Sequence, residues 1–367
     1  MRAYELHGVN DLRREDIEKP EIPSGWVLVQ VKASGICSSD IPRIFTNGTY
    51  HFPTIPGHEF SGVVAAYGEG VPEERVGKRV GIFPLIPCRT CPQCRQKKYE
   101  MCEHYDYLGS RRDGGFAEYV AVPDWNLLEL PESIRLSTDL SCVRQAEIVV
   151  ISIGSQGLQG LMDQLRPLAL GDKIFVLCMK GLEQGTGRRL SQIAQENLDP
   201  SNAVAVWLGP GHVQEFYRGI PNCMVIDSSR EDVKRLLVQS FSSDLIRFYY
   251  GEDLIGNEVG AAAKNVVGIA AGFLDGKGLS SLKGALMSRG TREVARLIQA
   301  MGGSQLSAYG LCHLGDYEAT VFSRYSHNRQ FGESFIRGET YTDLAEGYYT
   351  VEALVLLGER YGVELPI

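Results

Sequence analysis

The sequence predicts a multidomain chain in three parts: a small all-β domain, a partial α/β sheet and an all-α C-terminal part. Residues 1–135 contain short segments that alternate apolar and polar residues, with glycine and proline between them. Residues 136–250 contain apolar runs separated by amphipathic stretches, which is typical of a parallel sheet covered by helices. Residues 251–367 have mainly helical patterns. A chain of 367 residues is long enough for two or three such domains.

Composition and charge limit the class of protein. A hydrophobic content of 44% with 22% charged residues is ordinary for a soluble globular protein, and the net charge of −8 gives no reason to expect nucleic acid or an anionic membrane as partner. The first residues lack the apolar core of a signal peptide, and the most apolar helices are too short and too interrupted to span a bilayer. Four of the nine cysteines cluster at metal-ligand spacing, whereas the others are scattered, as in a reducing cytosol. We therefore expect a cytoplasmic protein.

The first part combines short strands with a cysteine motif. Alternating segments at 27–36, 57–68 and 77–83 predict strands of a barrel or sandwich. The strongest motif of the chain is a loop with four closely spaced cysteines, Cys88, Cys91, Cys94 and Cys102. Four thiolates on short loops make a closed tetrahedral zinc site, and closed sites of this kind are structural. Disulfides or an iron–sulfur cluster are the alternatives; a reducing compartment disfavours the first, and the spacing does not exclude the second.

A second candidate metal group lies earlier in the chain, at Cys37 and the pair His58–Glu59. Each is weak alone, because a buried cysteine and a turn histidine are commoner than ligands. Together with the four-cysteine loop they resemble the zinc-dependent medium-chain alcohol and polyol dehydrogenases of the galactitol-1-phosphate type. The resemblance implies a GroES-like β-barrel with a catalytic zinc at Cys37, His58 and Glu59, and with Ser39 beside the zinc-bound alcohol. It ends near residue 134, before the Rossmann domain of that family.

The α/β part has no clear nucleotide fingerprint. Apolar runs at 147–154, 173–181, 203–211 and 222–228 predict buried strands. The segment GSQGLQG at 154–160 follows the first run, but its spacing is GxxGxxG rather than GxGxxG. It therefore does not specify the tight turn that holds a pyrophosphate.

The stretch 251–276 predicts one helix with an unusual face. Gly256, Gly260, Lys264, Gly268 and Gly272 recur every four residues. Such residues lie nearly above one another, drifting by about 40° per step. A glycine within a helix costs roughly 0.5–1 kcal/mol relative to alanine, so the stripe needs a compensating reason. Either another backbone or a ligand that reaches the lysine approaches closely, or the helix is tightly packed and its lysine is incidental.

The helical part also resembles a second family. GNEVGAAAKNVVGIAAGFLDGKGL, LMSRGTREVARL at 286–297, GLCHLGD at 310–316 and SHNRQFG at 326–332 are similar to segments of NAD(P)-dependent glycerol-3-phosphate dehydrogenases. The likeness runs in order from about residue 136 to the C-terminus. It implies a partial Rossmann-like domain at 136–250, a catalytic helical domain at 251–367, and a small phosphorylated polyol as substrate. Zinc and NAD(P) are the cofactors that the two resemblances imply.

The second resemblance assigns roles to individual residues. Lys264 would exchange a proton with the substrate oxygen, Asp316 would orient its ammonium, and Thr320 would hydrogen-bond substrate. The residues implied as catalytic are Lys264, Lys180, Asp316 and Thr320. The residues that would contact the substrate are Lys180, Gly209, Gly211, Asn265, Ser326, His327 and Asn328. The residues that would contact the cofactor are Val213, His327 and Glu346. A solvated loop lysine is the alternative for Lys180, and a surface glutamate for Glu346. His327 stands where that family has arginine, so Arg324 or Arg329 would have to compensate.

The first half of that family's nucleotide domain, with its GxGxxG turn, has no counterpart here. We interpret the chain as a chimera of a zinc domain, residues 1–135, and a glycerol-3-phosphate dehydrogenase that lacks this half. In the resemblance, EIVVISI corresponds to the fourth strand of the nucleotide domain, which lies beside the first strand in a doubly wound sheet. Because the first strand has no counterpart, EIVVISI should form an unpaired edge. We expect NAD(P)H binding to be absent or weak unless a partner chain supplies the strands, as in a homo-oligomer. A zinc-dependent alcohol or polyol-phosphate dehydrogenase and a non-catalytic fusion are the alternative functions.

Overall fold

The computed structural model describes residues 1–367 except 38, 136, 212–215, 217–218, 324–325 and 342–343. The chain divides into two compact units, Met1–Leu136 and Ser137–Ile367. The α/β part and the helical part share a hydrophobic core within the second unit, in which Ile151 and Phe175 cluster with Ala261 and Cys312. No helix in the described ranges has the length and apolarity that a membrane span requires.

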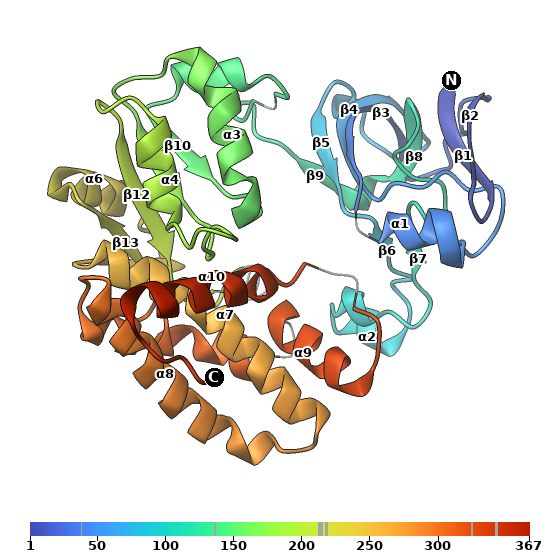
Figure 1. The fold of residues 1–367 in the computed structure, drawn as a ribbon. Helices are drawn as coiled ribbons and strands as arrows, with labels where there is room; N and C mark the ends of the chain where they lie inside the picture. Colours follow the sequence, from blue (N-terminus) through green and yellow to red (C-terminus); the bar gives the residue numbers. More distant parts are fainter. Residues whose placement is uncertain (38, 136, 212–215, 217–218, 324–325, 342–343) are drawn as a thin grey trace. The chain divides into compact units, whose positions relative to one another are not determined.

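The first unit is built from antiparallel strands (Figure 1). The segments predicted at 27–36, 57–68 and 77–83 are confirmed as strands β3, β4 and β5. The main sheet has the order β8-β3-β4-β5-β9, and two hairpins pair β1 with β2 and β6 with β7. The bounds are β1 Arg2–Gly8, β2 Asp11–Asp16, β3 Trp26–Gly35, β4 Glu59–Tyr67, β5 Arg79–Ile82, β6 Leu85–Ile86, β7 Asp106–Tyr107, β8 Tyr119–Pro123 and β9 Leu127–Glu129, with short helices α1 Asp40–Pro42 and α2 Pro92–Arg95.

The core of this unit follows from the alternation of its strands. Every second residue of β3 points inward, which places Val27 and Val29 in one buried cluster. Valines of three neighbouring strands complete that cluster: Val64, Val80, Val120 and Val122. The alternation of the strands therefore produces an apolar face that packs into the core of this unit.

The second unit begins with a five-stranded sheet in the order β10-β11-β12-β13-β14. All neighbours are parallel except β12 and β13, which are antiparallel. The four predicted apolar runs are confirmed as strands, whereas β14 was missed because only Phe248 of its five residues is buried. The bounds are β10 Ile148–Ile151, β11 Ile174–Leu177, β12 Ala203–Leu208, β13 Asn222–Ser228 and β14 Ile246–Tyr250, with helices α3 Leu158–Leu165, α4 Leu190–Asn197 and α6 Glu231–Phe241.

Strand β10 is an edge strand, as the sequence predicts. It hydrogen-bonds to β11 on one side, and no described strand lies on its other side. Val150 is 46% exposed and Ile153, just beyond the strand, is 42% exposed. A central strand of a complete parallel sheet would bury such side chains on both faces.

Four helices form the rest of the second unit: α7 Leu254–Gly276, α8 Lys283–Ala300, α9 His327–Arg337 and α10 Glu346–Tyr361 (Figure 1). The helical pattern of residues 316–332 does not form one continuous helix. The segment contains a 3-10 turn that ends at Asp316, a π-helical turn at Glu318–Phe322 and then α9. Ser326 caps α9, because its side chain accepts a hydrogen bond from Arg329 N at 3.3 Å.

The glycine stripe of α7 is the surface on which the segment after α8 packs. A Cβ added at Gly268 would lie 2.7 Å from Thr320 Cγ2, and one at Gly272 would lie 2.0 Å from the carbonyl oxygen of Arg329. Real Cβ atoms do not approach other atoms so closely. The close partner of the stripe is therefore another part of the chain. This segment packs against the two turns of α7 that follow Lys264.

The packing predicts a large stability difference between two glycine positions. We expect Gly272→Ala to lower the free energy of unfolding by about 1–3 kcal/mol, because the added methyl group meets backbone that cannot move freely. Gly160→Ala is the matched control: Gly160 is exposed on α3 and a Cβ there meets no atom within 4 Å, so a gain of about 0.5–1 kcal/mol is expected. Urea unfolding of the full chain measures both, and equal effects would contradict this packing.

Candidate active site

Lys264 occupies the middle of α7 with its side chain buried. Its Nζ lies 2.6 Å from Asp316 Oδ2 and donates a hydrogen bond to Thr320 Oγ1 at 2.8 Å. Thr320 Oγ1 in turn donates to the carbonyl oxygen of Asp316 at 2.9 Å. The structure therefore brings together the lysine, the carboxylate and the hydroxyl that the sequence singled out, and Asp316 and Thr320 face Lys264 from one turn.

Lys180 joins this group from the loop after β11. Its Nζ lies 2.8 Å from Asp316 Oδ2 and donates to the carbonyl oxygen of Gly209 at 2.6 Å. The side chain is 23% exposed, so Lys180 is not the solvated loop lysine of the alternative interpretation. Asp316 Oδ1 is buried and has no hydrogen-bond partner among the described residues. Two ammonium groups thus share one carboxylate oxygen, and no described residue donates a hydrogen bond to the second.

Burial changes the acidity of Lys264. The pKa of Lys264 is lowered from 10.5 to about 8, chiefly by desolvation and then by the nearby Lys180 ammonium, while the Asp316 carboxylate acts in the opposite direction. An ammonium with this pKa gives up and regains a proton near neutral pH. The geometry and the acidity of Lys264 therefore suit general acid–base chemistry.

A chain of side-chain amides joins the surrounding helices. Asn265 Nδ2 donates to the carbonyl oxygen of Lys180 at 2.9 Å, and Asn328 Nδ2 donates to Asn265 Oδ1 at 3.1 Å. Asn328 Oδ1 accepts from Gly347 N at 2.8 Å. These bonds position the Lys180 loop, α7, α9 and α10 relative to one another.

The remaining predicted residues lie at the edge of this group. Glu346 begins α10, and its carboxylate accepts hydrogen bonds from Ser155 N at 3.1 Å and from Ser155 Oγ. His327 Nδ1 lies 2.9 Å from Tyr341 Oη, and Ser326 caps α9. A Cβ added at Gly211 would lie 3.1 Å from the Phe216 ring. Val213 lies outside the described residues.

The arginine that was expected to compensate for His327 has other partners. Arg329 Nη1 lies 2.7 Å from Asp275 Oδ2 and 2.9 Å from Glu333 Oε2, and its side chain is 14% exposed. These two carboxylates hold Arg329 on α7 and α9. The other candidate, Arg324, lies outside the described residues.

One buried histidine near Lys264 was not predicted from the sequence. His313 is fully buried, with Nδ1 2.8 Å from the carbonyl oxygen of Gly260 and Nε2 2.8 Å from Tyr317 Oη. Burial lowers the pKa of His313 to about 4, so the ring is neutral. Gly260 lies one helical turn before Lys264, and His313 lies three residues before Asp316. The histidine therefore bridges the two segments that carry the pair, and its place in GLCHLGD was the available signal.

The described residues do not complete a dinucleotide site within one chain. The loop after β10 places Ser155 against Glu346, but this loop is the GxxGxxG segment, and Gly154 has an ordinary φ of −60°. The strand and glycine turn that would bind a pyrophosphate beside β10 are missing from the described sheet. The described residues therefore do not fit the pyrophosphate of a dinucleotide.

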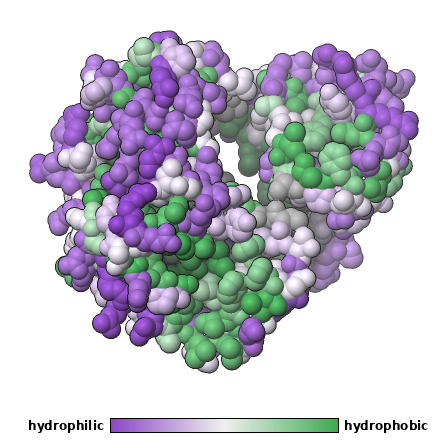
Figure 2. Space-filling view, viewed as in Figure 1, coloured by the Kyte–Doolittle hydropathy of each residue, from purple (hydrophilic) through white to green (hydrophobic). Residues whose placement is uncertain are grey.

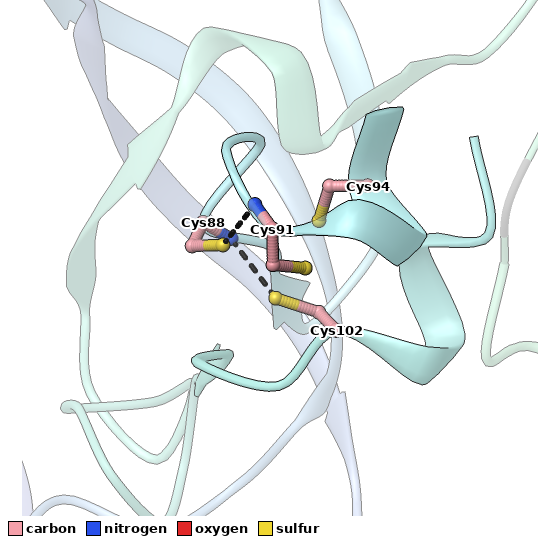
Figure 3. A group of neighbouring side chains, drawn as sticks. All are labelled: Cys88, Cys91, Cys94 and Cys102. Atoms are coloured by element: carbon pink, nitrogen blue, oxygen red, sulfur yellow. Dashed lines mark hydrogen bonds between the residues drawn. The ribbon is translucent and has the colours of Figure 1, made fainter. Parts of the chain in front are cut away.

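The four cysteines of the loop before β7 lie together in the first unit (Figure 3). Their sulfur atoms lie within 4.8 Å of one another, none is in a disulfide, and three of the four residues are buried. Cys88 N donates to Cys102 Sγ at 3.2 Å, and Cys91 N donates to Cys88 Sγ at 3.4 Å. Such backbone donors stabilise thiolates, and four thiolates around one point fit a tetrahedral zinc ion.

The second predicted metal group also converges. Ligand atoms of Cys37, His58 and Glu59 lie within 4.8 Å of one another, with Glu59 exposed and His58 buried. Ser39 Oγ donates to Cys37 Sγ at 3.5 Å. Asp40, which was not predicted from the sequence, belongs to this group as well. It is fully buried, and its Oδ1 lies 3.3 Å from His58 Nδ1. A carboxylate at this position orients a histidine so that its other nitrogen binds a metal. Three ligands with an open position suit a catalytic metal rather than a structural one.

Matches to known families follow the two-unit division. Residues 23–132 match the alcohol dehydrogenase GroES-like domain. Residues 123–234 match the N-terminus of NAD-dependent glycerol-3-phosphate dehydrogenase, and residues 253–367 match its C-terminus. The two resemblances noted in the sequence are thereby confirmed, and so are the fold classes that they imply.

Individual relatives agree with this division. The chain is 34% identical over 249 residues to the glycerol-3-phosphate dehydrogenase [NAD(P)+] of Prosthecochloris aestuarii, a match that covers 65% of this chain and 75% of the relative. It is 35% identical over 244 residues to the corresponding protein of Agrobacterium fabrum, with 65% and 74% covered. The crystal structure of glycerol-3-phosphate dehydrogenase from Coxiella burnetii superposes with a TM-score of 0.61 and 27% identity, covering 65% of this chain and 75% of that one.

The acidity of Lys264 can be measured without turnover. After reductive ¹³C-methylation, one lysine resonance should titrate near pH 8 and be absent from Lys264→Met, whereas exposed lysines titrate near 10.4. Because the folded pKa is lowered, the unfolded chain binds more protons between about pH 8 and 10.5, so the contribution of this group to stability rises with pH in that window. A Lys264 resonance that titrates above pH 10 would contradict the effect of burial.

Metal analysis tests the four-cysteine group. We expect about one tightly held zinc per chain after purification without added metal, and a second, weaker one at Cys37, His58 and Glu59. Cys91→Ser should lose the tight zinc and lower the unfolding temperature of the first unit, whereas Cys142→Ser, at an exposed cysteine elsewhere, should change neither. A chain that stays folded without metal would refute the structural role.

Proposed function

This chain belongs to the family of NAD-dependent glycerol-3-phosphate dehydrogenases, and we propose that residues 137–367 carry an oxidoreductase site for sn-glycerol 3-phosphate and dihydroxyacetone phosphate. The observation that supports this most is the buried group of Lys264, Asp316, Thr320 and Lys180. It offers an acid, a residue that orients it, a hydroxyl and a second positive charge around one point. Such a group matches a reaction in which a carbonyl oxygen gains a proton.

The chemistry of the site follows from the protonation of Lys264. When bound, a nicotinamide cofactor supplies or accepts the hydride at the substrate carbon. During reduction the Lys264 ammonium donates its proton to the carbonyl oxygen, and during oxidation the neutral amine removes the hydroxyl proton. Asp316 and Thr320 hold the ammonium in place, at 2.6 Å and 2.8 Å from Lys264 Nζ. The Lys180 ammonium adds positive charge, which stabilises the partial negative charge on that oxygen.

The phosphate end of the substrate would be held by Asn265, Asn328 and the residues at the start of α9. His327 replaces a permanently charged arginine, and Arg329 is already paired with two carboxylates. Phosphate recognition therefore depends on backbone and amide donors and on the imidazole of His327, which lacks the permanent, forked charge of an arginine. We expect weaker phosphate binding than in relatives that carry the arginine.

The NAD(P) site is the incomplete part of this proposal. Glu346 and Ser155 would contact the cofactor from the loop after β10, but the pyrophosphate needs a strand and turn beside that strand. We propose that completion of the site requires a partner that carries such a strand and turn and pairs with β10, because a second copy of the described chain lacks both. Support comes from the contrast between the two edges of the sheet: β14 carries the charged Arg247, whereas β10 carries no charged residue. An edge strand without a charge pairs readily with another strand.

The first unit would supply a zinc domain. The four-cysteine loop would hold a structural zinc, which crosslinks a segment that has little regular secondary structure. A second candidate function, oxidation of an alcohol at a zinc ion, is favoured by the convergence of Cys37, His58 and Glu59. This metal group would polarise an alcohol, but the described part of the first unit contains no parallel α/β sheet to bind a nicotinamide.

Turnover and cofactor binding test the proposal together. Reduction of dihydroxyacetone phosphate with NADH and NADPH is measured across a range of protein concentrations, with the mass of the species determined by light scattering. We expect cofactor binding by calorimetry and turnover to be absent or weak at every concentration of this chain alone, because each copy lacks the pyrophosphate turn. Micromolar binding of NADH to the monomer would contradict the incomplete site.

A lysine pair identifies the acid–base residue. Lys264→Met should lower kcat by about 100-fold or more in the form of the protein that turns over, since the proton donor is removed. Lys277→Met is the control, because Lys277 is exposed at the C-terminal end of the same helix. An equal loss of activity in both variants would refute the role of Lys264.

A further inference from the structure

The hairpin of β1 and β2 carries a histidine and two glutamates on one face. Glu5 and His7 lie two residues apart on β1, a spacing that places side chains on the same side of a strand. Glu15 of β2 pairs with Ala3 and therefore shares that side. The register shifts at His7, which marks a β-bulge, and a bulge re-aims a side chain. Figure 2 shows mainly hydrophilic residues over the part of the first unit where Figure 1 draws this hairpin.

The three side chains converge on one point. His7 Nε2 lies 3.3 Å from Glu15 Oε2 and 3.8 Å from Glu5 Oε2. One ligand atom of each residue lies within 4.8 Å of the other two. The exposed fractions of the side chains lie between 17% for Glu5 and 35% for Glu15. The ring nitrogen itself is covered, whereas the carboxylates leave the group open to a small ion from solvent.

Within the described chain, this group lacks the partners that would neutralise it. No lysine or arginine there forms an ion pair with Glu5 or Glu15. Arg13 faces Glu5 across the hairpin, but its guanidinium donates two hydrogen bonds to Asp11. A charged His7 ring would donate a hydrogen bond from Nε2 to one of the carboxylates, yet this nitrogen has no hydrogen-bond partner among the described residues. Two negative groups and a nitrogen lone pair therefore face one another, and like charges at this distance require a cation.

We propose that Glu5, His7 and Glu15 bind one divalent transition-metal ion, of the Zn²⁺ or Mn²⁺ type, which crosslinks β1 and β2. The two carboxylates balance the charge of the ion. The imidazole nitrogen favours a transition metal over Mg²⁺ or Ca²⁺, whose ligands are oxygen atoms. Ligand atoms about 2.0–2.2 Å from one ion lie at most about 4.4 Å apart. The present spacing of at most 4.8 Å therefore needs only small rotations of the carboxylates.

Such an ion would stabilise the start of the chain. Strands β1 and β2 form a two-stranded sheet of their own, and isolated bridges at Ala3 and Leu6 join it to neighbouring segments. A two-stranded hairpin alone is marginally stable in water. An ion held by both strands fixes their pairing next to the bulge. This role is separate from the two zinc groups described above, because none of the three ligands belongs to either.

Metal analysis of matched variants tests the site. The full chain is equilibrated by dialysis against micromolar Mn²⁺, and manganese and zinc are counted together per chain by mass spectrometry. We expect His7→Gln and Glu15→Gln each to hold about one ion fewer than the wild type, because each substitution removes one of three ligands. Glu18→Gln removes an exposed carboxylate just after β2 and should hold the wild-type number.

The same count can refute the site. An unchanged metal content in His7→Gln or Glu15→Gln would overturn the proposal, as would an equal loss in Glu18→Gln. Circular dichroism shows whether each variant is folded, and Glu5→Gln, which also removes one ligand, replaces either of the first two should it fail to fold. None of these measurements depends on cofactor, substrate or turnover, so their outcome is independent of the proposed dehydrogenase site.

Discussion

The second unit depends on a buried carboxylate shared by two ammonium groups. Asp316 is fully buried, and its Oδ2 lies 2.6 Å from Lys264 and 2.8 Å from Lys180. A buried charge is tolerated only with partners of opposite sign, so this contact constrains three separate elements: α7, the loop after β11 and the turn before α9. The glycine stripe of α7 follows from the same constraint, because the segment with Asp316 and Thr320 reaches Lys264 only where the neighbouring helix positions carry no side chain.

One carboxylate cannot neutralise two ammonium groups, and this imbalance shapes the chemistry. The excess positive charge lowers the pKa of Lys264 beyond the effect of burial. It also makes the site attractive for an oxygen that gains negative charge during a reaction. His313 supports the arrangement from behind without adding charge, since its buried ring is neutral and is held by Gly260 and Tyr317.

The two units are stabilised in different ways. The first packs a valine-rich sheet and gathers four thiols in a loop that has almost no regular structure, where a bound zinc would replace a core. The second has a large core, but its sheet stops at β10, a strand with the apolar composition of an interior position. β10 has the apolar composition of an interior strand but lies at the edge of the sheet. No described strand pairs with its outer side.

Local sequence determined much of this protein: the cysteine spacing, the valine alternation of β3, the parallel-sheet strands and the glycine face around Lys264 all depend on neighbours within a few residues. Only the tertiary structure decided which distant groups meet. The pairing of Lys180 with Asp316, the bond from Glu346 to Ser155 and the engagement of Arg329 by Asp275 join residues far apart in the chain. Periodicity reports which face a residue occupies, whereas the partner on that face depends on how whole elements pack.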